Sequence, residues 1–115
     1  ASDAALAAGD DEEFGRQGVR FHVTLWRATH NDVLFETTRN LAIRLNPFRM
    51  FQLRSDGRQV ANNEDHKTLL TLIDAGKADE AYTFMRGHVT VQGDVLAEYI
   101  SVAPRPVLQT QAEYA

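Results

Sequence analysis

Residues 64–88 read EDHKTLLTLIDAGKADEAYTFMRGH and decide the fold class of this chain. Apolar residues recur every three or four positions on both sides of Gly76, which is the spacing of one face of an α-helix. We predict one helix over about residues 64–75, ended by Gly76, and a second over about residues 78–102. Each of the two helices carries one histidine on its apolar face, His66 in the first and His88 in the second.

Upstream of this stretch the sequence predicts three further helices. The first ends at Gly9. The second begins at Asp10, an N-cap residue with Glu13 in capping-box position, and runs to about residue 29. Asn31 caps the third, in which Pro47 predicts a kink or an early stop because proline removes a backbone hydrogen bond.

The fold class that follows is all-α, an antiparallel helical bundle with no sheet. Residues 55–63 are rich in turn-forming residues and are predicted to be a loop. In the second helix the predicted inward residues are Phe14, Gly18, Phe21, His22, Leu25 and Trp26, and in the third they are Leu34, Thr38, Leu41, Leu45 and Phe48. In the last two helices they are His66, Leu69, Leu70, Ile73, Ala81, Met85, His88, Gln92, Val95 and Tyr99.

Length and charge narrow the class of protein. The chain has 115 residues, enough for one domain with one core. Its net charge is −4, and five of its acidic residues lie among the first thirteen residues, so the rest of the chain is nearly neutral. A nearly neutral sequence does not predict a basic surface that would bind nucleic acid. The acidic N-terminus, the absence of cysteine and the absence of a long apolar run predict a cytoplasmic protein without a membrane partner.

Three of the four histidines fall on the apolar faces of three different predicted helices: His22, His66 and His88. A buried imidazole without a partner costs about 1–3 kcal/mol, so three converging imidazoles are satisfied at lower cost as ligands of one divalent cation. The alternative is three separate core histidines, each with its own hydrogen bond. His30 lies in a turn and is predicted to be exposed.

Two motifs resemble a known family. They are RFHxxL at residues 20–25, followed by Asn31, and EDHKTLLxxIDAGxADEA followed by MRGH. Over about residues 4–102 the chain resembles the FadR C-terminal (FCD) domain, the effector-binding module of GntR-type transcription regulators. In its metal-binding branch, one aspartate and three histidines hold a divalent cation beneath a cavity for small organic acids.

The resemblance assigns the three histidine ligands to His22, His66 and His88, but it does not supply the aspartate. Gly18 stands one turn before His22, where the aspartate is expected. Either the three imidazoles hold zinc or nickel, with waters or an effector carboxylate completing its coordination, or the site has lost its metal and the histidines donate hydrogen bonds to an anion.

The resemblance also implies that other parts of the regulator are missing from this chain. We expect residues 1–102 to form the C-terminal part of the module, without its first helices, and residues 103–115 to form a loose tail. DNA would be bound only through a separate winged helix-turn-helix domain, and a homodimer would cover apolar surface.

The sequence therefore predicts a non-enzymatic sensor that binds a small carboxylate effector. Arg44 is a candidate partner for that carboxylate, and its alternative is an exposed surface charge. Two other functions stay open. One is a small metal-dependent hydrolase or transferase built on the three-histidine site, and the other is a dimerisation module with inert core histidines.

Overall fold

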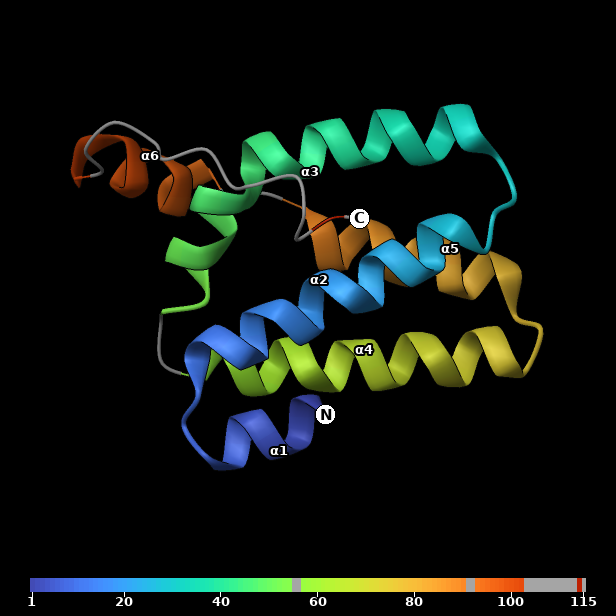
Figure 1. Ribbon diagram of the computed structural model, residues 1–115, viewed down its shortest axis with the longest axis horizontal. Coiled ribbons are helices and arrows are strands. Elements are labelled where there is room, and N and C mark those ends of the chain that lie inside the picture. The colour runs from blue at the N-terminus through green and yellow to red at the C-terminus, as the bar shows by residue number, and fades with distance from the viewer. Residues whose placement is uncertain (55–56, 91–92, 103–113, 115) are drawn as a thin grey trace.

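The computed structural model describes residues 1–54, 57–90, 93–102 and 114. These residues form helices and turns without a strand, which confirms the all-α prediction. The helices are α1 (Ser2–Ala7), α2 (Asp11–Arg27), α3 (Asp32–Gln52), α4 (Arg58–Asp74), α5 (Ala78–Val89) and α6 (Gly93–Val102). Figure 1 shows α3 along the top of the view and α1 at the bottom, with α2 and α4 between them.

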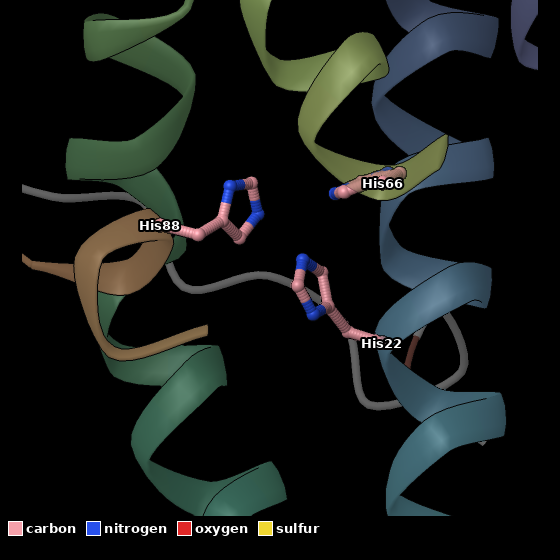
Figure 2. Close-up of side chains that lie close together, drawn as sticks. All are labelled: His22, His66 and His88. Atoms are coloured by element: carbon pink, nitrogen blue, oxygen red, sulfur yellow. The ribbon is translucent and has the colours of Figure 1, made fainter. Parts of the chain in front are cut away.

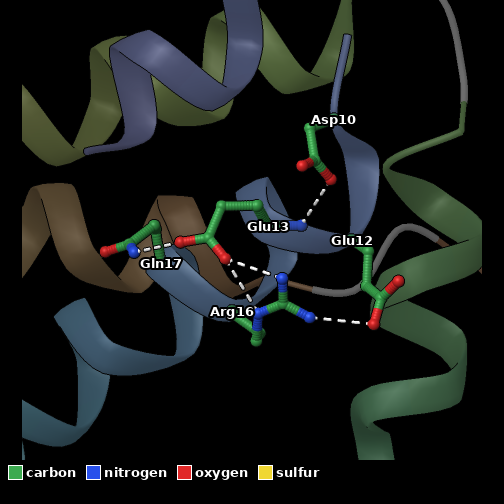
Figure 3. Close-up of polar contacts among 5 residues, drawn as sticks. All are labelled: Asp10, Glu12, Glu13, Arg16 and Gln17. Carbon is green, nitrogen blue, oxygen red and sulfur yellow. Dashed lines mark hydrogen bonds and ion pairs between the residues drawn. The ribbon is translucent and has the colours of Figure 1, made fainter. Parts of the chain in front are cut away.

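The two predicted N-caps are present. The Asp10 carboxylate accepts a hydrogen bond from the Glu13 backbone N–H at 3.0 Å (Figure 3), and the Asn31 side chain accepts one from the Leu34 N–H at 3.0 Å. The capping box at Asp10 is only half formed. The Glu13 carboxylate turns away from the cap and binds Arg16, while the Asp10 N–H donates to the Ala5 carbonyl at 3.0 Å.

Helix α3 contains Pro47 and continues past it to Gln52. Of the two predicted outcomes the structure has the kink: Figure 1 shows α3 changing direction in its last turns. These turns pack closely on α2, because a Cβ added at Gly15 would lie 3.3 Å from the Met50 sulfur. Glycine at this position lets the end of α3 approach the helix that carries His22.

The predicted inward face of α3 is wrong except at Phe48, which is buried, and Thr38, which is partly buried. Leu34, Leu41 and Leu45 are about half exposed, at 47%, 57% and 47%. The buried face lies one residue further along the chain, and a step of one residue rotates a helix by about 100°. On that face Phe35 and Asn46 are buried, and Ala42, Ile43 and Arg49 are partly buried.

Helix α4 begins at Arg58, so residues 58–63 are helical and their predicted loop is wrong. Gly57, at φ 77°, supplies the left-handed turn that starts the helix. The extra turns of α4 are tied to α1, because the Asn63 amide donates to the Asp3 carboxylate at 2.7 Å and Lys67 lies 3.1 Å from the same carboxylate. Of the predicted inward residues of α4, His66 and Leu69 are buried, whereas Leu70 and Ile73 are about half exposed.

The predicted last helix is divided into α5 and α6. Helix α5 ends at Val89, and Thr90 has an extended backbone with ψ 129°. Ala81, Met85 and His88 are partly buried, as predicted, and so are Val95 and Tyr99 on α6; Gln92 lies outside the described residues.

The core joins α2 and α3. Val19, Val23 and Phe35 form a buried cluster with Tyr114, which is 1% exposed and is the only described residue of the predicted tail 103–115. Helix α4 packs against α1 and α5, and α3 packs against α6. Within the described part of the chain, no helix combines the length and apolar character needed to cross a membrane.

Candidate metal centre

Three helices bring His22, His66 and His88 to one point. His22 comes from the middle of α2, His66 from the middle of α4 and His88 from the last turn of α5. Figure 2 shows the three rings turned toward a shared space, and their centroids lie 5.0–5.5 Å apart. One ring nitrogen from each histidine lies within 4.8 Å of the other two. The predicted convergence of this histidine cluster is present in the structure.

Two of the three imidazoles are deeply buried and lack partners for one nitrogen. His22 is 2% exposed and His66 is 6% exposed. Neither Nε2 atom has a hydrogen-bond partner among the residues that the structure describes. Leaving a buried polar atom unpaired costs about 1–3 kcal/mol, so each Nε2 is an atom that a ligand would satisfy. Hydrogen bonds to the described residues therefore do not account for the Nε2 atoms of His22 and His66.

The third imidazole is oriented by a carboxylate. His88 Nδ1 lies 2.9 Å from Asp65 Oδ2, and the His88 side chain is 3% exposed. A carboxylate on one ring nitrogen fixes the tautomer and leaves the other nitrogen free to bind a metal. Asp65 directly precedes His66 in the sequence, yet its carboxylate is hydrogen-bonded to His88 on the neighbouring helix.

Burial keeps His22 and His66 neutral. Burial lowers the pKa of His22 to about 2, helped by the positive charge of Arg49 and by the neighbouring histidines. Burial also lowers the pKa of His66 to about 4, again with contributions from His88 and Arg49, while Asp65 acts in the opposite direction. Because a metal binds the neutral imidazole, both residues are in the ligand form at neutral pH.

The donor set fits a divalent transition metal. Nitrogens bound to zinc lie about 2.0–2.1 Å from the ion, so tetrahedral ligands are separated by about 3.4 Å. The cluster, with its ligand atoms within 4.8 Å of one another, reaches that geometry after small side-chain movements. A Cβ added at Gly18 would meet no atom of another described element within 4 Å, so space exists where the aspartate ligand is missing.

Arg44, the predicted carboxylate partner, is exposed on α3. It does not belong to the small pocket beside the cluster, whose described lining contains Arg49 and Arg58 together with Asp65 and His88. The guanidinium that faces the histidines is that of Arg49. Sequence reasoning missed it because the inward face of α3 was placed one residue too early.

The comparison with protein families matches the FCD domain model over residues 1–91, which include all three histidines. This chain is an FCD domain. The resemblance noted in the sequence is confirmed, and FCD domains are regulatory effector-binding modules rather than catalytic ones. No curated protein and no solved structure gives a significant match to this FCD domain.

Proposed function

We propose that this FCD domain senses a small organic acid through a divalent metal held by His22, His66 and His88. The metal is zinc or nickel, since three neutral imidazoles suit both ions. The observation that carries the proposal is the convergence of three imidazoles, two of which have an unpartnered Nε2 among the described residues.

The effector is proposed to bind where the aspartate ligand of the family is missing. Three neutral imidazoles leave a divalent ion with its full charge of +2 and with open coordination positions. Gly18 leaves space at the position where a fourth protein ligand is expected. A carboxylate from the effector enters that position, neutralises part of the charge and completes the coordination of the metal.

The three ligands come from three helices, so occupancy of the site alters how α2, α4 and α5 pack. In the intact regulator this change biases the placement of winged helix-turn-helix domains that are separate from residues 1–102, the sensor domain. We further propose that the sensor acts as a homodimer in the cytoplasm. The exposed leucines of α3, Leu34, Leu41 and Leu45, are apolar surface that a second copy would cover.

An enzyme built on the same site is less well supported. Metal-dependent hydrolysis needs a general base close to the metal-bound water. Asp65, the carboxylate beside the cluster, is bonded to His88 and orients that ligand. The histidine cluster itself contains no carboxylate among the described residues.

The proposal predicts that acetate binds to the metal-loaded domain and not to the metal-free domain. Purified protein is analysed for its metal content, stripped with a chelator and reloaded with zinc or nickel. Acetate is then titrated into each form by calorimetry, because a carboxylate needs the open position of the metal. Equal acetate binding with and without metal would show that the histidines bind the anion directly.

Replacing Gly18 with aspartate is expected to raise the affinity for zinc by about tenfold or more and to weaken acetate binding. The added carboxylate takes the position that acetate occupies, and space for it is available. Gly18→Asn is the matched control, because it has nearly the same size without the charge. Zinc affinities come from competition with a chromophoric chelator. An aspartate variant that binds zinc no better than the asparagine variant would contradict the proposed position of the open site.

A further inference from the structure

The pocket beside the histidine cluster lies between the end of α3, the first turns of α4 and the last turn of α5. It has a volume of about 50 Å³, which is room for a few waters or one carboxylate group. Since His88 and Asp65 belong to its wall, the pocket adjoins the proposed metal site. Its described lining is Arg49, Gln52, Leu53, Arg58, Ala61, Asn62, Asp65 and His88.

Arg49 is a partly buried cation without a counter-ion among the described residues. Other arginines of the domain are ion-paired on the surface: Arg16 with Glu12 and Glu13, and Arg39 with Glu36. No described carboxylate forms an ion pair with Arg49, and burial lowers its pKa, an effect that Tyr114 partly opposes. Removing part of a guanidinium from water is costly where no described anion lies beside it, so Arg49 favours an anionic ligand in the adjoining pocket.

The charges around the pocket also favour an anion. Arg49 and Arg58 contribute two positive charges to its wall, and its one described carboxylate, Asp65, is engaged with His88. The charge of Arg49 reaches the cluster, since it helps to lower the pKa of both His22 and His66. A bound metal would add a second positive centre. With one carboxylate on the metal, both guanidinium groups would still lack a carboxylate partner among the described residues.

We propose that the effector is a small dicarboxylate, with one carboxylate on the metal and the second bound by Arg49, with Arg58 at the exposed side of the pocket. A planar guanidinium binds a carboxylate through two parallel hydrogen bonds, which gives both affinity and orientation. This inference rests on the proposed function, because it assumes that the histidine cluster holds a metal. It assigns the carboxylate-binding role to Arg49 instead of Arg44.

The test titrates acetate, malonate, succinate and inorganic phosphate into the zinc-loaded domain. At least one dicarboxylate is expected to bind about tenfold or more tightly than acetate or phosphate. Arg49→Gln is expected to reduce that dicarboxylate to the acetate level while zinc affinity stays within about threefold. Arg44→Gln is the matched control, because it removes an exposed arginine of the same helix. It is expected to behave as the wild type.

Three results would overturn the inference: no preference for a dicarboxylate over acetate, an equal response to phosphate, or a preference that survives Arg49→Gln. If Arg49→Gln melts at a lower temperature or loses helical circular dichroism, Arg49→Lys replaces it. This variant keeps the charge without the paired hydrogen bonds and is expected to lose most of the preference. Zinc affinity is measured for every variant. If the wild type binds no zinc, the proposed function fails, and the titrations are repeated without metal. An Arg49-dependent preference for a dicarboxylate in the metal-free titrations would still support a carboxylate site at Arg49. No such preference in those titrations would reject the site.

Discussion

The metal-free domain is expected to lose roughly 4–5 kcal/mol of its free energy of unfolding when the pH falls from 6.5 to 4.5. Burial, assisted by the charge of Arg49, lowers the pKa of His22 to about 2 and that of His66 to about 4. In the unfolded chain both histidines titrate near 6.5. Between pH 6.5 and 4.5 the unfolded state binds up to two protons more than the folded state, so each histidine removes up to about 1.4 kcal/mol per pH unit.

The measurement is urea unfolding at several pH values in the presence of a chelator. His66→Phe is expected to lose roughly half as much free energy of unfolding as the wild type over this pH range, because it removes one of the two proton-binding sites. The phenyl ring preserves the stacking on Phe21, whose ring lies 4.0 Å from that of His66. The exposed histidine at position 30 provides the control, as His30→Asn tolerates its positive φ of 53° and leaves the cluster intact. Equal unfolding free energies at pH 6.5 and 4.5 in the wild type would contradict the burial of neutral imidazoles.

The helix caps could be predicted from the sequence because their chemistry is local. Asp10 and Asn31 each supply an oxygen to an N–H three residues later, and this contact depends on nothing distant in the chain. The half-formed capping box at Glu13 could not be predicted in the same way. Its carboxylate is close to Arg16 on the next turn, and an ion pair competes with the return bond to Asp10.

Helix α3 shows where local patterns fail. Its most apolar stripe contains Leu34, Leu41 and Leu45, and that stripe is exposed in this chain. The stripe that faces inward contains polar residues, the buried Asn46 and the partly buried Arg49. Hydropathy alone selects the first stripe, whereas the tertiary structure selects the second, because the second faces α2 and the histidine cluster.

The histidine cluster could be predicted because its members share two properties visible in the sequence: a position on an apolar face and the same residue type. Its supporting residues share neither. Asp65 lies at a helix position where a carboxylate is ordinarily solvated, and its role depends on α5 packing against α4. Arg49 depends on the rotation of α3, which the sequence pattern placed one residue away. The roles of both residues can be predicted only when the relative positions of the helices are known.

Zinc or nickel at 100 times its dissociation constant is expected to raise the Tm of the domain by roughly 10 °C. A ligand that binds only the folded state at this concentration adds about 2.7 kcal/mol, and a domain of 115 residues has an unfolding entropy of about 0.24 kcal/mol/K at Tm. Ordinary imidazoles would lose this stabilisation as the pH falls through about 6. Because His22 and His66 stay neutral to a lower pH, we expect the rise in Tm to persist at pH 5.5.

The variant that tests this result is His66→Ala, in which the rise in Tm is expected to disappear while the helical circular dichroism remains. The substitution removes the α4 ligand, which lies within 4.8 Å of the other two, and leaves only the imidazoles on α2 and α5 to hold the metal. His30→Asn is again the control and keeps the full rise, since His30 is exposed and outside the cluster. A rise of the same size in His66→Ala would place the metal elsewhere on the chain. A rise that appears in the wild type, vanishes in His66→Ala and is reversed by a chelator would assign the metal to the three buried imidazoles.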